Sequence, residues 1–413
     1  MSPLQNRRSL MSGRHHMEPA LGSVRVLAIR SAYGQVLVLV ALGLVALLAM
    51  AAIVIDGGNA WVQQRGTQNG TDSASEAGAV VLVQMLAATN PSWTSSQWDA
   101  AVADAVTTAA SNTQNNLTSI KGYYTDVSGN LLTTSGTTAT DLTNAAVVGA
   151  GTVPTGAQGV RALGTRTFNA YLAGIIGITN LTTPADATTV AGALGGICAA
   201  SDGCAVVPVT VPVIVDTCAG NGVMVPGTGP WPLVAPADAS GANEAIVPLC
   251  KNGPGAVGWL DLGAGNLSQQ ITTPTNQAFD VPTWLQTNPG NPNNVDTEMN
   301  TYDGEIILIP MFDGTCKDKP TGGALTDCTA GAGVGNDTWY HIPKFTAFLL
   351  DHAYIQGNNH PECNSAPGAP FVGGHGSTSC LKGWFTKYIT QGPVVAGGGG
   401  STDPSVMGVQ LIK

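Results

Sequence analysis

Four histidines in the C-terminal half of the chain could bind a metal ion or act in a hydrolase, because acidic residues stand near them in sequence. These histidines and acidic residues are His341, His352, His360, His375, Asp313, Asp351 and Glu362. None of them forms a His-Glu-x-x-His motif, and the chain has neither a Gly-x-Ser-x-Gly turn nor a Gly-x-x-x-x-Gly-Lys-Ser/Thr loop. The sequence therefore predicts no catalytic residue, no metal and no cofactor. An anchored hydrolase is the least favoured alternative.

Carboxylates elsewhere could bind Ca²⁺, in the acidic loops 296–303 and 313–318. Neither loop has the twelve-residue spacing of a calcium-binding hand, so calcium binding stays an open alternative. Asp126 and Ser128 match the first positions of a metal-binding Asp-x-Ser-x-Ser motif, but Asn130 stands in the third. We therefore predict a hairpin turn at this place.

The cysteines predict disulfides in an oxidising compartment, because all eight lie beyond residue 197. They are Cys198, Cys204, Cys218, Cys250, Cys316, Cys328, Cys363 and Cys380. No Cys-x-x-Cys pair indicates a zinc or redox site. Eight cysteines allow on the order of a hundred connectivities. Pairing sequence neighbours, namely 198 with 204, 316 with 328 and 363 with 380, closes the shortest loops and leaves 218 with 250.

An apolar run without a charged or strongly polar side chain, Val36–Ile55, precedes all of these residues. A helix of this length is about 30 Å long, which matches the hydrocarbon core of a bilayer. We predict a transmembrane helix over 34–56 after a basic N-terminal segment, 1–33. The alternative is a cleaved signal peptide, since Ala49-Met-Ala51 is a cleavage-like motif, but the apolar run continues past it.

The charges on the two sides of this run predict its orientation. Five arginines and one glutamate precede it, so the positive-inside rule places the N-terminus in the cytoplasm and exports the rest. We therefore predict a single-pass protein of the cell membrane whose bulk is extracytoplasmic and whose first partner is the lipid bilayer. Only 10% of all residues are charged and the net charge is −10, which excludes nucleic acid as a partner.

The patterns beyond the span predict an α+β fold. Residues 57–195 are expected to form an α+β module, in which the transmembrane helix continues as an amphipathic helix to about Ala88. A second helix is expected over 95–115, capped by Ser95 or Ser96. Runs at 159–168 and 185–194 predict strands of a small antiparallel sheet, and residues 169–178 between them predict a short apolar helix.

Residues 196–413 are expected to form a β-rich, disulfide-stapled extracytoplasmic domain. Further strands or short helices are predicted at 258–263, 304–312, 339–355, 381–389 and 406–413, separated by turn-forming segments rich in Gly, Pro and Asn. Four glycines at 397–400 predict a flexible hinge before the last of these strands.

Residues 34–79 resemble the N-terminal segment of TadG-like (TadE/G-like) proteins of the Flp (Tad) pilus assembly system. In that family Gly-Gln opens an apolar span, Asp-Gly closes it, and an Arg-x-x-Gln-Asn-x-x-Asp-x-Ala-x-x-Ala-Gly-Ala helix follows. The matching residues are Gly34, Gln35, Asp56, Gly57, Arg65, Gln68, Asn69, Asp72, Ala74, Ala77, Gly78 and Ala79. The resemblance implies a bacterial membrane protein, with a pilin-like α+β module over 57–195, that is a structural or accessory component of pilus assembly and not an enzyme.

Small residues along this segment could let helices of this kind pack closely, at Gly43, Ala46 and Ala49 in the span and at Ala74, Ala77 and Gly78 beyond it. The partners implied are other pilus-assembly or membrane proteins, and the same surface could join copies of this chain.

Asp56 is expected to lie hydrated at the outer end of the span, with pairing to a partner as the alternative. A different class of function stays open as well. Eight Trp and eight Tyr in a chain poor in charge are compatible with a membrane-anchored extracellular adhesin or binding module.

Overall fold

The protein is described by a computed structural model that divides into two compact units, residues 1–59 with 169–179 and residues 60–168 with 180–413. The described residues are 27–87, 92–112, 116–197, 206–214, 216–218, 224–226, 229–249, 258–263, 265–273, 279–288, 295–332, 338–355, 360–364, 379–395 and 405–413. The predicted hinge at 397–400 lies outside them.

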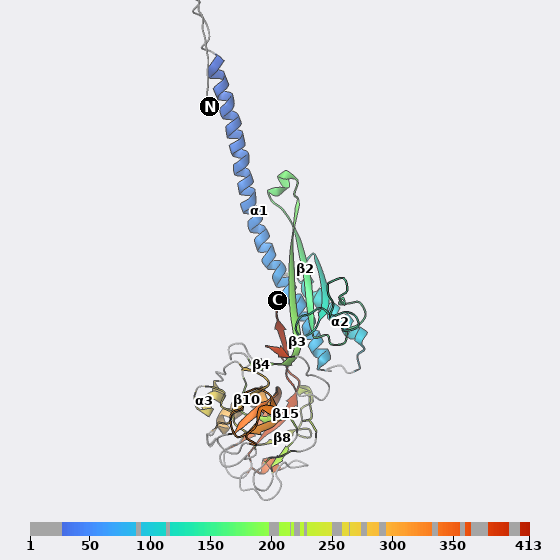
Figure 1. Cartoon of the computed structure of the whole chain (residues 1–413), viewed down its shortest axis with the longest axis vertical. Coiled ribbons are helices and arrows are strands. Elements are labelled where there is room, and N and C mark those ends of the chain that lie inside the picture. The colour runs from blue at the N-terminus through green and yellow to red at the C-terminus, as the bar shows by residue number, and fades with distance from the viewer. Residues whose placement is uncertain are drawn as a thin grey trace, which may run out of the picture. The chain divides into compact units, whose positions relative to one another are not determined.

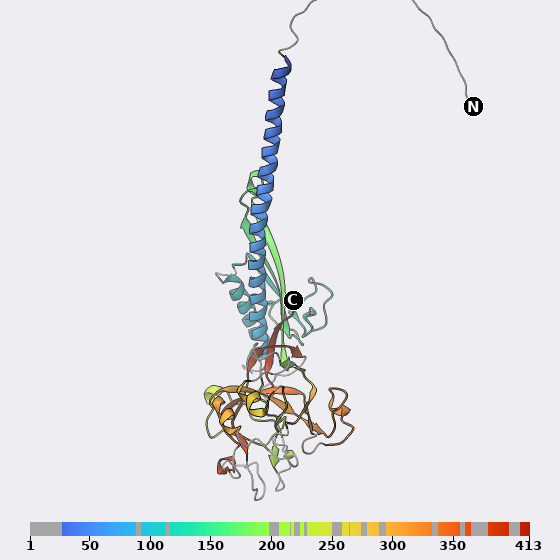
Figure 2. The same ribbon diagram turned by 90° about the vertical axis from the view of Figure 1, so that its left-hand side faces the viewer.

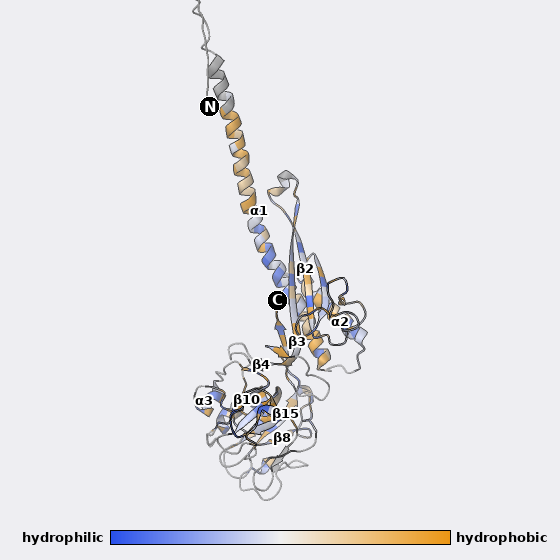
Figure 3. Cartoon of the chain, viewed as in Figure 1, coloured by the Kyte–Doolittle hydropathy of each residue, from blue (hydrophilic) through white to orange (hydrophobic). Residues whose placement is uncertain are grey.

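One continuous helix, α1 (Leu27–Leu86), begins in the first unit and ends in the second (Figure 1). No proline interrupts it, and its first half consists of the apolar run, whose side chains are exposed (Figure 3). Its most apolar window has a mean hydropathy of 3.1, and none of that window is buried. Within the described part of the chain, α1 is the helix long and apolar enough to cross a membrane, which confirms the predicted N-terminal apolar helix.

The second helix, α2 (Ser95–Ser111), begins at the predicted residue, but its cap is not one of the two predicted serines. Thr94 is the N-cap: its Oγ1 accepts from the Gln97 N–H at 3.3 Å, and the Gln97 side chain accepts from the Thr94 N–H at 2.9 Å. This reciprocal pair needs a glutamine three residues after the cap, which Thr94 has, so the predicted cap at Ser95 or Ser96 is wrong. The helix also ends before the predicted Asn115.

A sheet in the order β1-β2-β3-β18-β16 packs against both helices, and β17 also pairs with β3. The strands are β1 (Ser119–Thr125), β2 (Gly159–Asn169), β3 (Asn180–Leu194), β16 (Ile389–Gln391), β17 (Val394–Val395) and β18 (Met407–Leu411). β2 and β3 are the predicted strands, longer than expected. The C-terminal strand β18 runs antiparallel to β3, with Gly408 opposite Gly192. The end of the chain thus completes the sheet on which α1 lies.

The second half of α1 is buried in this module through two adjacent rows of its own side chains. Ala74 and Leu82 pack with Val106 of α2 and Val160 of β2, while Ala79 and Val83 pack with Ala191 and Met407. At Gly78 the helix comes so close that an added Cβ would lie 2.8 Å from Val106 Cγ2 and 3.1 Å from Val160 Cγ2.

The remaining strands form the β-rich part of the chain. A five-stranded sheet has the order β5-β11-β14-β15-β8, and a three-stranded sheet the order β10-β13-β12. Their strands are β5 (Val211–Pro212), β8 (Ala245–Pro248), β10 (Thr283–Gln286), β11 (Ile306–Phe312), β12 (Gly314–Cys316), β13 (Trp339–Ile342), β14 (Lys344–Tyr354) and β15 (Cys380–Thr386). Large side chains such as Trp259, Phe348 and Phe385 fill the core of the larger sheet.

Short elements complete this part. Two strand pairs join β4 (Gly196–Ile197) to β9 (Phe279–Asp280) and β6 (Asp216–Cys218) to β7 (Met224–Pro226). The short helices are α3 (Leu267–Thr272), α4 (Asp296–Met299), and the 3₁₀ turns η3 (Pro236–Asp238), η4 (Asn300–Tyr302), η5 (Leu325–Asp327) and η7 (Pro361–Asn364).

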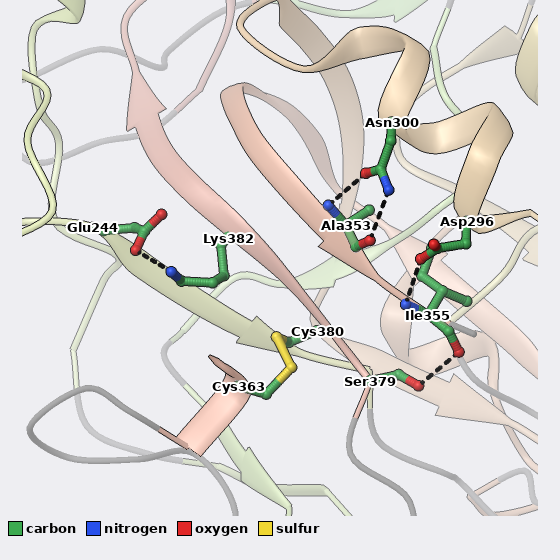
Figure 4. The surroundings of a disulfide bond; sticks show 9 residues. All are labelled: Glu244, Asp296, Asn300, Ala353, Ile355, Cys363, Ser379, Cys380 and Lys382. Carbon is green, nitrogen blue, oxygen red and sulfur yellow. Dashed lines mark hydrogen bonds and ion pairs between the residues drawn. A yellow bond between two sulfur atoms is a disulfide. The ribbon is translucent and has the colours of Figure 1, made fainter. Parts of the chain in front are cut away.

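Two disulfides join sequence neighbours, Cys316 to Cys328 and Cys363 to Cys380. The second ties η7 to the start of β15 (Figure 4). The other two predicted pairings involve Cys198, Cys204 and Cys250, which lie outside the described residues.

Gly78→Ala is expected to lower the free energy of unfolding by about 1–3 kcal/mol, because the added methyl overpacks the contact with Val106 and Val160. The matched change Gly58→Ala, at a position of α1 where an added Cβ meets nothing within 4 Å, should not destabilise. Denaturant unfolding of the detergent-solubilised full chain, followed by tryptophan fluorescence, measures both. Equal stability of the two variants would contradict the close approach at Gly78.

Candidate assembly site

Asp56, the residue that directly follows the apolar run, accepts hydrogen bonds from the connection between β2 and β3, and both belong to the first unit. The ribbon of this connection lies beside α1 in both views (Figures 1 and 2). Its carboxylate accepts backbone N–H groups of Tyr171 at 2.7 Å, Leu172 at 3.0 Å and Ala173 at 2.5 Å. These groups lead into the 3₁₀ turn η1 (Ala173–Ile176), where N–H donors have no partner inside the turn. A carboxylate is a favourable partner for them.

The expected hydrated position of Asp56 is therefore wrong. The side chain is buried, 5% exposed, because the loop 169–179 covers it. The loop was predicted as a short apolar helix, and its composition gave no sign that its backbone would bind an acid more than a hundred residues earlier.

Beyond Asp56, three small hydroxyl residues at four-residue spacing face the sheet from α1, Thr67 and Ser75 toward β3 and Thr71 toward Gly164 of β2. Thr67, Thr71 and Ser75 are fully buried. Thr67 Oγ1 lies 2.8 Å from Thr183 Oγ1, and Ser75 Oγ lies 2.8 Å from Thr189 Oγ1. These residues were not among the predicted site residues, although their spacing of four along a helix places them on one face.

The motif residues Gln68 and Asp72 extend this contact. Gln68 Nε2 donates to Asp72 Oδ1 at 2.7 Å and to the Asp186 carbonyl oxygen at 3.3 Å. The Asp186 carboxylate in turn accepts from Arg161 Nε at 2.9 Å and Nη2 at 2.6 Å, and pairs with the Lys413 ammonium. The network thus joins α1, β2, β3 and the C-terminal residue.

The charge state of Asp186 depends on this network. Burial opposes the ionised carboxyl, but the hydrogen bonds from Arg161 and Lys413 outweigh it, so that the pKa of Asp186 lies below its ordinary value of 3.8. The Arg161 pair is a two-pronged, charge-assisted contact, which is stronger than a neutral hydrogen bond.

The other motif residues divide by exposure. Ala74, Gly78 and Ala79 are buried within the chain, and Ala77 is half-buried. Gly34 and Gly57 have open space around them, Asn69 is exposed, and the Arg65 guanidinium lies 4.5 Å from the Trp61 ring centre. The side chain of Gln35 lies outside the described residues.

This division corrects one expectation. Ala74 and Gly78 were expected to offer a surface to like helices, but α2 and β2 of the same chain cover them. Small residues were needed there because the sheet lies close to the helix. Gly43, Ala46 and Ala49 in the apolar run are exposed and stay available to a partner.

The histidines do not come together as a site within the described residues. His341 Nδ1 lies 2.5 Å from Asp313 Oδ1, and its Nε2 lies 2.9 Å from the Gly323 carbonyl oxygen. His352 Nδ1 lies 2.8 Å from Asp303 Oδ2, and its Nε2 lies 3.2 Å from Asn300 Nδ2. Both nitrogens of each ring therefore contact groups of the chain itself, which leaves them poorly placed for a substrate.

The polar and acidic groups near them have structural contacts as well. The Asn300 side chain donates to the Ala353 carbonyl and accepts the Ala353 N–H, and Asp296 accepts the Ile355 N–H at 2.9 Å (Figure 4). Lys382 Nζ lies 2.7 Å from Glu244 Oε2, while burial and the nearby Asp351 carboxyl raise the pKa of Glu244.

No three His, Cys, Asp or Glu side chains in the described ranges lie close enough to hold a metal ion. His360 has its ring 5.7 Å from the Tyr354 ring, and His375 lies outside those ranges.

The predicted turn at Asp126 is confirmed: its Oδ1 accepts the N–H groups of Ser128 and Asn130, each at 2.9 Å.

An open hollow of about 500 Å³ lies where α1 ends and α2 begins, lined among others by Met85, Trp93, Trp98 and Pro154. Trp93 is 40% exposed, and its ring centre is 4.7 Å from that of Trp98. Trp98 itself is 5% exposed, so Trp93 is the tryptophan that the hollow exposes.

Comparison with known proteins identifies one segment. Residues 34–81 match the Tad family model, described as Flp pilus-assembly TadE/G-like, which confirms the resemblance inferred from the sequence. No match was found among curated proteins or among solved structures. The matched residues include the exposed apolar run, Asp56 and most of the buried half of α1.

Asp186→Asn is expected to cost about 1–2 kcal/mol of unfolding free energy near pH 7, a modest value because the Asp186 and Arg161 side chains are about a quarter exposed. Since the pKa of Asp186 is lowered by folding, its contribution is present above pH 3.8 and is lost as pH falls through the lowered value. The difference between wild type and variant should therefore shrink in acid.

Thermal unfolding between pH 7 and pH 3 measures this difference, with Asp104→Asn as the control, since Asp104 is exposed on α2. A difference between wild type and Asp186→Asn that stays constant down to pH 3 would contradict the assigned ion pair.

Proposed function

We propose that the protein is a membrane-anchored structural or accessory component of Flp (Tad) pilus assembly, TadG-like in kind, and not an enzyme. The observation that carries this proposal is the Tad match over 34–81. The exposure of these residues along α1 agrees with it. The first half exposes an apolar surface on every side, and the second half is part of the protein's own core. An apolar helix that no other described segment of the chain covers needs a bilayer, helix partners, or both.

The proposed topology places the N-terminus in the cytoplasm and the sheets outside. The arginines before the span and the absence of basic residues until Arg65 support this orientation. The two described disulfides support an oxidising compartment for the β-rich part.

The proposed partners are the bilayer and other pilus-assembly or membrane proteins, with a second copy of this chain as an additional candidate. The exposed small residues Gly43, Ala46 and Ala49 are the part of the motif-bearing helix that could admit a close helix contact.

Crosslinking in native membranes followed by mass spectrometry tests this proposal. The wild-type chain is compared with a variant in which 36–55 is replaced by an unrelated apolar run of the same length. Residues 56–86 are kept, because replacing them would remove Ala74 and Leu82 from the core. A second variant, Gly43→Leu/Ala46→Leu/Ala49→Leu, changes only the exposed small residues.

We expect the wild type to crosslink to pilus-system proteins and both variants to lose these crosslinks while remaining in the membrane. Loss in the first variant alone would move the contact to other residues of the span. Crosslinks unchanged in both variants, or absent from the wild type, would contradict assembly through the span.

An extracellular adhesin or binding module is the second candidate function. The observation that favours it is the open hollow with Trp93 and Trp98. If this function holds, Trp93→Ala should abolish retention on an immobilised glycan array that the wild-type full chain binds, while leaving membrane crosslinks unchanged.

A further inference from the structure

We propose that the loop between β2 and β3, residues 170–178, is a second membrane-contacting element that lies in the interfacial layer of the bilayer beside the span. The inference rests on the proposed function, since it requires α1 to cross the membrane at its apolar run. The loop, here called the interfacial loop, belongs to the same compact unit as residues 1–59.

The position of the interfacial loop follows from Asp56. This residue comes one position after Ile55, so it marks the end of the apolar run. Three backbone N–H groups of the loop lie 2.5–3.0 Å from its carboxylate oxygens. The headgroup layer on each side of a bilayer is roughly 5–7 Å thick. A loop held this close to the end of the run therefore lies at the depth of that layer.

The composition of the loop is typical of a segment at the membrane–water interface and not of a loop in bulk water. Residues 170–178 read Ala-Tyr-Leu-Ala-Gly-Ile-Ile-Gly-Ile, without a charged side chain. Tyr171 is 70% exposed and Ile178 is 46% exposed. Tyrosine is enriched at membrane–water interfaces, where its ring contacts acyl chains and its hydroxyl stays hydrated.

Backbone N–H groups of the loop also have hydrogen-bond partners within the protein. This matters in a poorly hydrated environment, where unpaired polar groups are costly. Asp56 accepts the N–H groups of Tyr171, Leu172 and Ala173. The Gly177 N–H bonds to the Gly174 carbonyl, and the Ile178 N–H bonds to the Ala173 carbonyl, each at 3.1 Å. The Ala170 N–H closes the base of the loop on the Thr179 carbonyl at 2.9 Å. Asp56 thus holds the loop in place. It also accepts the three loop N–H groups that have no carbonyl partner within the loop's own turn.

Depth-dependent quenching of a fluorophore tests the proposal. One extra cysteine is introduced into the full chain at Ile178, labelled under non-reducing conditions with an environment-sensitive fluorophore, and reconstituted into vesicles of phosphatidylethanolamine and phosphatidylglycerol. Quenching by a lipid with a nitroxide near the top of its acyl chain is compared with quenching by aqueous iodide. Ala41→Cys reports on the span, and Asp104→Cys on an exposed position of α2.

We expect the lipid nitroxide to quench the labels at 41 and 178 but not the label at 104. Adding Asp56→Ala to the Ile178→Cys chain should reduce lipid quenching at 178 to the level at 104 and leave position 41 unchanged. Gly57→Ala is the matched control, since an added Cβ there meets nothing within 4 Å, and it should change neither label.

Three results would overturn the inference in distinguishable ways. A label at 178 that only iodide quenches, with 41 quenched by lipid, refutes the interfacial loop and leaves the anchor intact. A label at 178 that neither agent reaches shows that protein, and not lipid, covers the loop. A label at 41 that lipid does not quench refutes the membrane span itself, and with it the proposed anchoring.

Discussion

The structure depends on one constraint: a single unbroken helix has to present apolar side chains outward along its first half and to join a protein core along its second. These two tasks require different side chains. The exposed half carries large aliphatic residues on all sides, whereas the buried half carries Gly, Ala, Ser and Thr on the side that meets the sheet. The change from outward-facing apolar residues to core residues begins after Asp56. The Tad segment, residues 34–81, includes parts of both halves.

The buried half explains why the motif contains so many small residues. Gly78 admits Val106 and Val160, and the hydroxyls of Thr67 and Ser75 reach Thr183 and Thr189 without a gap for water. Larger side chains would push the sheet away and break these hydrogen bonds. The small residues of the buried half therefore allow a close contact of α1 with α2 and the sheet inside one chain.

Much of this could be read from the sequence, and the reasons for success and failure are physical. The span, α2 and the strands at 159–168 and 185–194 are local patterns of period 3.6 or 2, which a sequence displays directly. The pairing of β18 with β3 and the binding of Asp56 to Tyr171–Ala173 join residues more than a hundred positions apart, and no local pattern specifies them. The histidines show the converse, because nearness in sequence suggested a cluster, while His341 and His352 bind different carboxylates.

The acid at the end of the apolar run has a consequence for how the segment can work. A carboxylate in a half-apolar setting is costly unless donors surround it, and here the donors come from a loop that would otherwise leave them unpaired. Each side therefore satisfies the other, and removing either leaves buried polar groups without partners. The Asp-Gly pair of the motif thus does more than end a hydrophobic stretch: its acidic member fixes a second piece of chain at the end of the helix. If α1 crosses a membrane, that arrangement sets the depth of the loop by hydrogen bonds and not by the apolar character of the loop alone.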